Sequence, residues 1–358
     1  MLAFTADFDY FCKSVSLLLR KSILENQKII DLLEDKLRSE SPELLPTLLI
    51  DQTMSRAKER TCNIFWATND YEHLGEGFAY SDEITTEHIT GEHGHIIQPR
   101  ICKNKETQIL RSKDKAEVFT PSWICNNQNN LIDNAWFGKE GVFNSENDDN
   151  TWTVNNAPIT FPEGKTWKDY VRDIRLEITC GEAPYLASRY DTVTGEFIPV
   201  EQRIGMLDRK LRVINENCHK SGEWLKAARE AYKSVYGFEW QGDSLLIARE
   251  TLLYTFVENY RLKFGKNPLK KSLKSIADII SWNLWQMDGL KGVVPNSCTT
   301  QKDTKKNIFG EEFIEEKPCN GCLKGNIHEH NGIKCLIRDW RKSPKEKQIE
   351  TFISSIKF

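Results

Sequence analysis

Residues 174–183 read IRLEITCGEA, and the fold expected for this chain follows from them. Apolar side chains alternate with polar ones along this stretch, as they do in a β-strand, and Cys180-Gly181 then ends the strand. A helix is expected to follow, because Pro184 suits a first-turn position.

Two further strands are predicted along the chain. Residues 235–240 (VYGFEW) predict the second strand, and residues 279–287 (IISWNLWQM) predict the third. Between them, Asp243-Ser244 predicts the start of a helix that ends at Gly265. Strands that alternate with helices favour an α/β fold with a parallel sheet and crossover connections.

The residues at the strand ends suggest a ligand, because molecules bound to such sheets lie at the carboxyl ends of the strands. Gly181 follows the first strand, where a glycine lets a bound molecule approach the backbone closely. Glu239 ends the second strand and would accept hydrogen bonds from a ribose diol. Asp288 ends the third and would accept one from a purine amine. This order favours a pocket for a nucleotide or S-adenosylmethionine.

The composition excludes several classes of protein. The chain has 358 residues, of which 39% are hydrophobic, so it can bury a sizeable core and is neither wholly disordered nor fibrous. No run approaches the ~18 apolar residues of a membrane span, and the first residues lack the features of a signal peptide. Ten cysteines in such a chain indicate reduced thiols or metal ligands. We therefore expect a cytoplasmic protein with no membrane partner.

Four regions are expected. They are a helical N-terminal region (1–60), a loop-rich region (61–165), the core with the sheet (166–300) and a basic tail rich in Cys and His (301–358). In the first, residues 9–38 predict a helix that either packs on its own domain or forms a dimeric coiled coil. In the second, residues 72–95 predict a solvated acidic loop, with a histidine metal site as the alternative, and residues 126–163 predict loops with short strands.

The tail contains a candidate zinc site. Its spacing is Cys-x2-Cys-x5-His-x-His-x4-Cys, and the candidate ligands are Cys319, Cys322, His328, His330 and Cys335. The alternative is a set of reduced surface thiols. Six Lys and Arg residues lie around Trp340, which is typical either of a nucleic-acid contact or of a solvated surface. The net charge of −3 gives no global sign of a DNA-binding protein, so any such contact would be local.

Four segments, in this order, resemble motifs of the DNA adenine-N6 methyltransferases of restriction–modification systems. They are residues 114–121 (DKAEVFTP), 176–183 (LEITCGEA), 236–243 (YGFEWQGD) and 286–289 (QMDG). From about residue 60 to about 340, the chain is also similar to bacterial proteins described as the modification subunit of a restriction system. The resemblance covers about three quarters of the chain.

The resemblance implies a Rossmann-like, S-adenosylmethionine-dependent methyltransferase that acts on DNA, together with a second restriction–modification subunit as a further partner. The cofactor contacts that it implies are Phe119, Thr120, Pro121, Glu177, Cys180, Gly181, Glu239 and Asp288. The first three would form a lid over the cofactor, and the loop with Glu177 and Gly181 would face its methionine part. The last two acids would hold its ribose and its adenine.

The sequence departs from this family in three places. Ala183 stands where the family has a second glycine, and 57 residues separate Gly181 from Glu239, including a hairpin expected at 191–197 that could touch DNA or a partner. None of the 12 prolines is next to another, so the family's [DNS]-P-P-[YFW] element, which holds the flipped adenine, is absent and no catalytic residue is assigned. Two alternatives to a complete enzyme therefore stay open, namely a non-catalytic subunit and the N-terminal part of a split enzyme.

Overall fold

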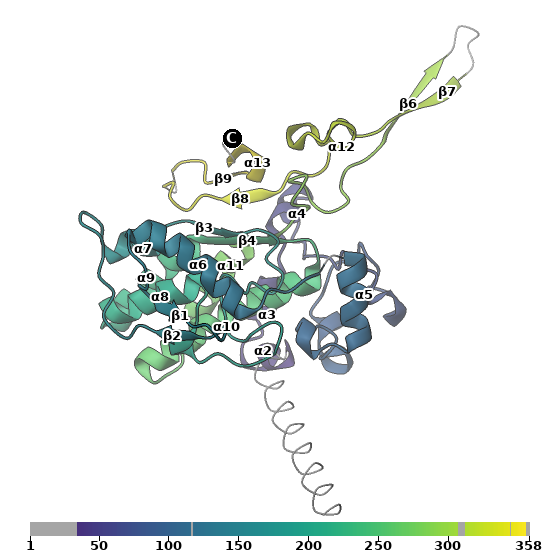
Figure 1. Ribbon diagram of the computed structural model, residues 1–358. Helices are drawn as coiled ribbons and strands as arrows, with labels where there is room; N and C mark the ends of the chain where they lie inside the picture. The colour runs from purple at the N-terminus through teal and green to yellow at the C-terminus, as the bar shows by residue number, and fades with distance from the viewer. Residues whose placement is uncertain (1–33, 116, 307–311, 344, 356–358) are drawn as a thin grey trace, which may run out of the picture.

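The computed structural model describes residues 34–355, apart from 116, 307–311 and 344. It is a mixed α/β structure with many helices and several small sheets (Figure 1). Most of the helix predicted for residues 9–38 lies outside the described residues. Its described end, α2 (Glu34–Glu40), stops just before Pro42, as a proline requires.

The sheet of the core has three parallel strands in the order β3-β4-β5. These strands are β3 (Arg175–Glu177), β4 (Val235–Glu239) and β5 (Leu284–Gln286). Glu177 pairs with Gly237, and Glu239 pairs with Gln286, so the carboxyl ends of all three strands meet at one edge. The expected parallel sheet is therefore present, with Glu239 as the last residue of its middle strand.

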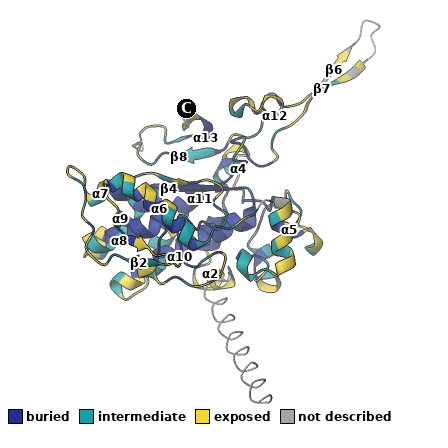
Figure 2. Cartoon of the chain, viewed as in Figure 1, coloured by how far each residue is buried: buried dark blue, intermediate teal, exposed yellow. Residues whose placement is uncertain are grey.

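Helices connect the strands and cover one face of the sheet. The helices between the strands are α8 (Met206–Asn217), α9 (Ser221–Lys233), α10 (Gly242–Phe264) and α11 (Lys270–Asn283). Figure 1 shows them on one side of the sheet and the C-terminal segment on the other. Every residue of β4 is buried, and so are most residues of α10 (Figure 2). The predicted helix end at Gly265 is confirmed, since Gly265 caps α10 with a φ of 64°.

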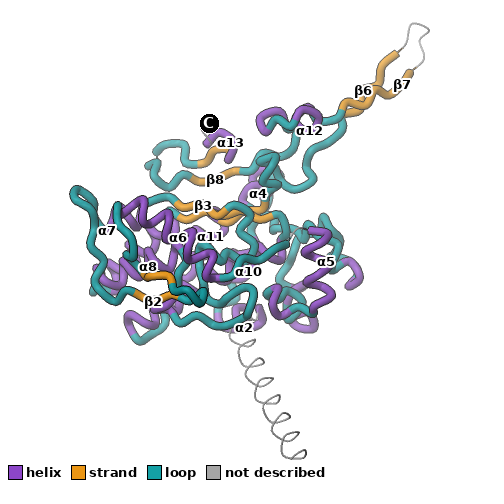
Figure 3. Tube along the Cα trace, viewed as in Figure 1, coloured by secondary structure: helices purple, strands orange, loops and turns teal. Residues whose placement is uncertain are grey.

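The remaining elements surround this core, and loops make up much of the chain (Figure 3). The helices are α3 (Leu44–Leu49), α4 (Gln52–Ala57), α5 (Lys105–Lys115), α6 (Ser122–Phe137), α7 (Trp167–Arg172), α12 (Asn320–Lys324) and α13 (Phe352–Ser355). The strands are β1 (Asn144–Glu146), β2 (Trp152–Val154), β6 (Gln301–Lys306), β7 (Glu312–Lys317), β8 (Leu336–Arg338) and β9 (Ile349–Thr351). The acidic stretch 72–95 holds three short 3-10 turns, at Glu72–Leu74, Glu87–Ile89 and Gly91–His93.

The two faces of the sheet have separate apolar cores. The helical face belongs to the large core, and the opposite face forms a smaller cluster around Tyr236, Phe238 and Trp285. Phe352 of α13 packs on this second cluster, with its ring centroid 5.8 Å from that of Phe238 and 5.5 Å from that of Trp285. The C-terminal segment thus covers the face of the sheet that the helices leave open (Figure 1).

Strand β3 lies at the open edge of the sheet and carries exposed apolar side chains. Ile174, Leu176 and Ile178 are 42%, 39% and 69% exposed. Their alternation is the pattern that predicted the strand, but among the described residues β3 pairs with β4 alone. An open edge with apolar residues is unusual, because such strands pair readily with other chains.

Three predictions of secondary structure are wrong. The turn after Gly181 does not lead into a helix, and Pro184 lies in a series of turns. Residues 279–283 belong to the last turns of α11, so the third strand begins only at Leu284. Residues 126–137, predicted as loop, form most of α6, although the short strands β1 and β2 within 126–163 are present as expected.

Candidate functional site

A cavity of about 750 Å³ opens at the carboxyl ends of β3 and β4. Six of the eight cofactor contacts implied by the resemblance line it, and these are Phe119, Thr120, Glu177, Cys180, Gly181 and Glu239. They come from segments that are up to 120 residues apart in the sequence, since 239 − 119 = 120. The parallel register brings the residues at the ends of β3 and β4 to the same edge, and the segment before α6 adds Phe119 and Thr120.

Glu239 is anchored by backbone N–H groups at the end of β4. Its Oε2 accepts a hydrogen bond of 2.9 Å from the N–H of Gly181, and its Oε1 accepts one of 3.3 Å from Gln241. Gly181 has a φ of 52°, a conformation that a glycine adopts without strain. Burial raises the pKa of the Glu239 carboxyl, although these N–H donors act in the opposite direction. Each oxygen keeps a lone pair for a ligand donor.

Glu177 is the second buried acid of the cavity. Its two oxygens accept hydrogen bonds from the N–H groups of Tyr185 (3.2 Å) and Leu186 (3.1 Å). Burial nevertheless raises its pKa to about 8, and the nearby Glu239 adds to this shift. Within the described part of the chain, neither acid forms an ion pair with Lys, Arg or His. The cavity therefore contains two carboxyl groups that a cationic ligand would stabilise in their charged form.

The raised pKa of Glu177 predicts how stability depends on pH. Because this pKa lies above its ordinary value of 4.5, the folded chain holds the proton more tightly than the unfolded chain does. Glu177 therefore makes its full contribution to stability below about pH 4.5, and this contribution is lost as the pH rises toward 8. We expect Glu177→Gln, which cannot ionise, to gain stability relative to wild type between pH 5 and 8, by on the order of 3 kcal/mol.

Thermal unfolding of both proteins at pH 5, 6, 7 and 8 measures this difference. Glu201→Gln, an exposed acid outside the cavity, is the matched control and should show no such trend. A difference between Glu177→Gln and wild type that stays constant over this range would contradict the prediction.

The F-T-P element (Phe119-Thr120-Pro121) lies against the loop that contains Gly181. A Cβ atom added at Gly181 would lie 3.5 Å from Cε1 of Phe119, so the ring packs directly over this glycine. The predicted hairpin at 191–197 is present as an antiparallel bridge between Tyr190 and Phe197. Its Thr192 hydroxyl donates to the Thr120 carbonyl (3.1 Å), so in this chain the hairpin holds the F-T-P element in place.

A buried network of charges fixes the segment before the F-T-P element. Arg111 of α5 is 2% exposed and forms ion pairs with Asp70 (2.6 Å), Asp243 (2.9 Å) and Glu117. Asp243 lies in the first turn of α10, where Lys103 is a further partner at 3.2 Å. This network ties α5 and Glu117, two residues before Phe119, to the start of α10 beside the cavity.

Two of the eight implied contacts do not line the cavity. Pro121 is the N-cap residue of α6. Asp288 accepts hydrogen bonds from the N–H groups of Leu290 (3.1 Å) and Lys291 (3.2 Å) and forms an ion pair with the Lys291 ammonium (3.1 Å). Its carboxylate therefore stabilises the turn that follows β5.

The cavity wall also includes residues that are not among the eight implied cofactor contacts. Tyr80, Trp240 and Asn296 line one part of it, and the Trp240 indole N–H donates to the Tyr80 hydroxyl at 3.1 Å. Tyr80 comes from the acidic stretch and Asn296 from the loop after β5, and neither has a spacing that would identify it. Ala183, which replaces the family's second glycine, adopts a φ of 64° and is fully buried.

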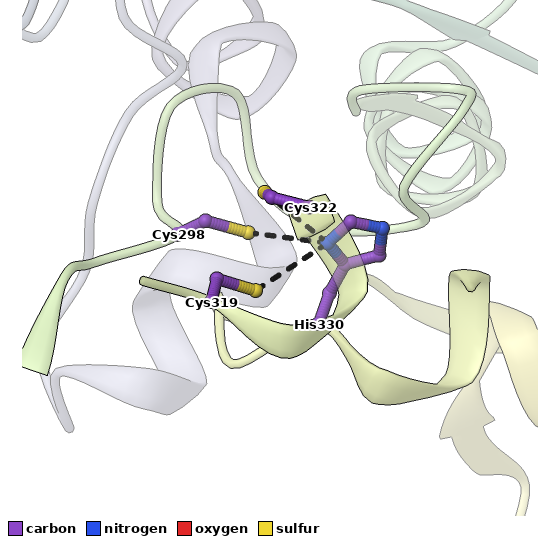
Figure 4. Close-up of side chains that lie close together, drawn as sticks. All are labelled: Cys298, Cys319, Cys322 and His330. Atoms are coloured by element: carbon purple, nitrogen blue, oxygen red, sulfur yellow. Dashed lines mark hydrogen bonds between the residues drawn. The ribbon is translucent and has the colours of Figure 1, made fainter. Parts of the chain in front are cut away.

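A second candidate site is a group of three cysteines and one histidine (Figure 4). The Sγ atoms of Cys298, Cys319 and Cys322 each lie 3.6 Å from Nδ1 of His330, and all four donor atoms lie within 4.8 Å of one another. One imidazole nitrogen makes a single hydrogen bond, so three sulfurs around it are better explained by a shared ion. The group could hold a metal ion such as zinc.

The dimensions of the group match those of a tetrahedral zinc site. With Zn–S of about 2.3 Å and Zn–N of about 2.0 Å, tetrahedral angles place S and N about 3.5 Å apart. The N–H of Asn331 donates to Sγ of Cys319 at 3.3 Å, which is a common support of a metal-bound thiolate. A Cβ at Gly321 would lie 2.5 Å from the N atom of His330, so the turn between the two cysteines requires glycine.

The ligand set differs from the one that the tail motif predicted. Cys319, Cys322 and His330 belong to the group, but His328 and Cys335 do not. Cys335 is fully buried against the sheet, where its thiol donates to the Gln286 carbonyl (3.4 Å). Cys298, which sequence reasoning missed, takes the fourth position from a loop 21 residues before Cys319, since 319 − 298 = 21.

No protein-family model matches the chain, and no curated protein or solved structure matches it either. In the part of the chain that the structure describes, no helix is both long enough and apolar enough to cross a membrane.

Proposed function

We propose that the cavity binds S-adenosylmethionine and that the chain is a methyltransferase-like protein of a restriction–modification system that acts on the adenine N6 of DNA. The observation that carries this proposal is the convergence of six residues, picked from separate sequence motifs, on one cavity. The parallel order β3-β4-β5, with helices in each connection, is consistent with one half of a Rossmann-like sheet.

The chemistry of the cavity supports a cofactor that combines a ribose with positive charge. S-adenosylmethionine carries a sulfonium and an ammonium group, and both Glu177 and Glu239 are buried acids whose pKa values are raised by burial. A nearby cation would favour their ionised forms. Glu239 also has the acceptor capacity for a ribose diol, and Gly181 and Phe119 line the same cavity.

The bound cofactor would supply its methyl group to the adenine amine in a single displacement, in which the C–N bond forms as the methyl C–S bond breaks, S-adenosylhomocysteine leaves as a neutral thioether and the amine gives up one proton to solvent. The protein would contribute positioning and exclusion of water rather than a covalent intermediate. Phe119 and Thr120 would close the cavity over the cofactor, held by Thr192 and by the Arg111 network. The residues that would hold the flipped adenine are not assigned, because the Pro-Pro element is absent from the sequence.

The second candidate function is that of a cofactor- or DNA-binding subunit whose catalytic element lies in another chain. The exposed edge of β3 favours this alternative, since Ile174, Leu176 and Ile178 are exposed and β3 pairs with β4 alone in the part of the chain that the structure describes. A strand from a partner chain would pair there and cover these side chains. Such a strand would also reach the ligand, because Glu177 and Thr179 of the same segment line the cavity.

Calorimetric titration with S-adenosylmethionine tests the proposal. We expect wild-type protein to bind it and Glu239→Gln to bind about 10–100-fold more weakly, because one charge-assisted hydrogen bond is lost. Glu201→Gln is the matched control, an exposed acid that should leave binding unchanged. Absence of binding by the wild-type protein would refute the proposal.

Methyl transfer to DNA separates the two candidate functions. Transfer of labelled methyl groups by the purified chain alone supports the enzyme. Binding of S-adenosylmethionine without transfer, followed by transfer when a partner subunit is added, supports the subunit.

A further inference from the structure

The loop after β5 connects the cavity to the Cys/His group. Asn296 of this loop lines the cavity, and two residues later Cys298 contributes its sulfur to the group. The other three members, Cys319, Cys322 and His330, come from the C-terminal segment (Figure 4). A metal ion held by all four side chains would therefore fix the end of the loop that carries Asn296 to the cavity wall.

Hydrogen bonds tie the same loop to the segment that carries His330. The Val294 N–H donates to the Ile333 carbonyl (2.8 Å), and the Ile333 N–H donates to the Ser297 hydroxyl (3.0 Å). Beyond Cys298, the Asn331 side-chain amide donates to the Thr299 carbonyl at 2.8 Å. Hydrogen bonds thus join residues 294–299 to residues 330–333. A metal ion bound by the four side chains would hold the two segments in this arrangement.

Asn296 is held in a constrained conformation at the cavity wall. Its φ is 55°, which non-glycine residues adopt infrequently, and its side chain interacts with the Tyr80 hydroxyl. Tyr80 in turn accepts the Trp240 indole hydrogen bond, and Trp240 directly follows Glu239. This part of the cavity combines two aromatic rings with an amide that both donates and accepts, a combination suited to a purine ring and its polar edge.

We propose that Asn296 contacts the base of the bound ligand and that the Cys298–Cys319–Cys322–His330 metal centre holds it in that position. Metal and ligand then bind cooperatively, and each raises the affinity of the other by the same factor. The inference rests on the proposed function and adds to it a base-recognition subsite formed by Tyr80, Trp240 and Asn296. Asp288, expected from sequence to hold the base, contributes instead to the turn that begins this loop.

The test compares the zinc-loaded, zinc-depleted and reloaded full chain, with S-adenosylmethionine as the probe. Zinc depletion is expected to raise the Kd at least 10-fold, and reloading is expected to restore it. Asn296→Ala in the zinc-loaded protein is expected to raise the Kd about 10-fold with an unchanged zinc content. Asn150→Ala is the matched control, because Asn150 is an exposed asparagine with a φ of 64° that is not among the residues lining the cavity, and this variant should bind like wild type.

Hydrogen exchange gives a readout that needs no ligand. Zinc is expected to protect residues 294–299 and the segment around Tyr80, with β4 unchanged as the check that the core stays folded. If zinc removal also unfolds β4, the affinities of zinc-loaded Asn296→Ala and Asn150→Ala for S-adenosylmethionine decide whether Asn296 contacts the ligand.

The outcomes separate this inference from the proposed function. If the zinc-loaded wild type binds S-adenosylmethionine but Asn296→Ala binds equally well, or if zinc leaves exchange in residues 294–299 unchanged, this inference is overturned and the proposed function stands. If the zinc-loaded wild type does not bind the probe at all, the proposed function is overturned.

Discussion

Purified protein is expected to contain one zinc ion per chain, and Cys298→Ala is expected to lose it while Cys335→Ala retains it. The reason is the geometry of the group, in which Cys298 lies 3.6 Å from His330 while Cys335 is buried against the sheet. Changes in the residues that support a metal ligand already cost about 10–100-fold in affinity, so loss of a ligand is expected to cost more than about 100-fold.

Metal analysis of the purified variants and competition with a chromogenic chelator measure this effect. The comparison is sharp because the tail motif includes Cys335 and omits Cys298, so the sequence and the structure predict opposite results. Zinc retention by Cys298→Ala together with zinc loss by Cys335→Ala would contradict the geometry. Because binding to a structural zinc site contributes directly to folding, the metal-free form is also expected to unfold at a lower temperature.

Arg111→Met is expected to destabilise the protein by about 3–5 kcal/mol, because it leaves buried acids without their main partner. Asp243 is fully buried, and Glu117 is also held by Arg111. Burial alone would raise the pKa of Asp243, but Arg111 and Lys103 outweigh it and hold this pKa well below its ordinary value. The midpoint of thermal unfolding should fall by roughly 4–7 °C.

The pH dependence gives this prediction a second readout. Since the folded pKa of Asp243 is lowered, its contribution to stability is present above pH 3.8 and is lost as the pH falls toward the folded pKa. In Arg111→Met the acids take up protons more readily, so the difference from wild type should shrink between pH 7 and 4. Lys105→Met, an exposed residue of the same helix, is the control and should change stability little. An equally small effect of Arg111→Met would refute the role of the network.

The core of the fold was predictable where the apolar pattern of a strand or helix agrees with the residues that mark its ends. Strand β4 and helix α10 follow the prediction because an apolar run leads into Glu239 and a glycine ends the helix. The third strand was misplaced because apolar residues at the end of α11 and those of β5 form one continuous run, which periodicity alone cannot divide. Burial of Ile279 and Ile280 occurs in the helix.

Helix α6 was missed because its buried face is polar. Asn126, Asn130 and Asp133 lie on that face and are buried. Arg209 donates to all three, at 2.9, 2.7 and 2.6 Å respectively. A search for apolar residues at helical spacing detects no helix in such a segment. These three side chains find their partner in Arg209 of α8, far away in the sequence, which local patterns do not reveal.

The candidate sites show the same contrast. The residues of the cavity that directly follow strands were found from sequence, because the end of a parallel strand is a recognisable place. Asn296 and Cys298 were not, because they lie in a loop whose position depends on contacts with residues 331–333. Spacing within the tail suggested Cys335, but a ligand set assembled from two distant segments leaves no spacing rule to follow.

The β6–β7 hairpin begins three residues after Cys298 and ends two residues before Cys319, and it projects away from the body of the molecule (Figure 1). A metal ion bound at its base would connect the chain on both sides of this arm. The covalent backbone through the hairpin would then be dispensable for holding the two parts together. A protease that cut within the arm would leave two polypeptides joined by the metal ion, and after chelation only the hydrogen bonds and the packing of the C-terminal segment on the sheet would hold them together. The metal centre would thus act as a removable cross-link between the loop after β5 and the C-terminal segment.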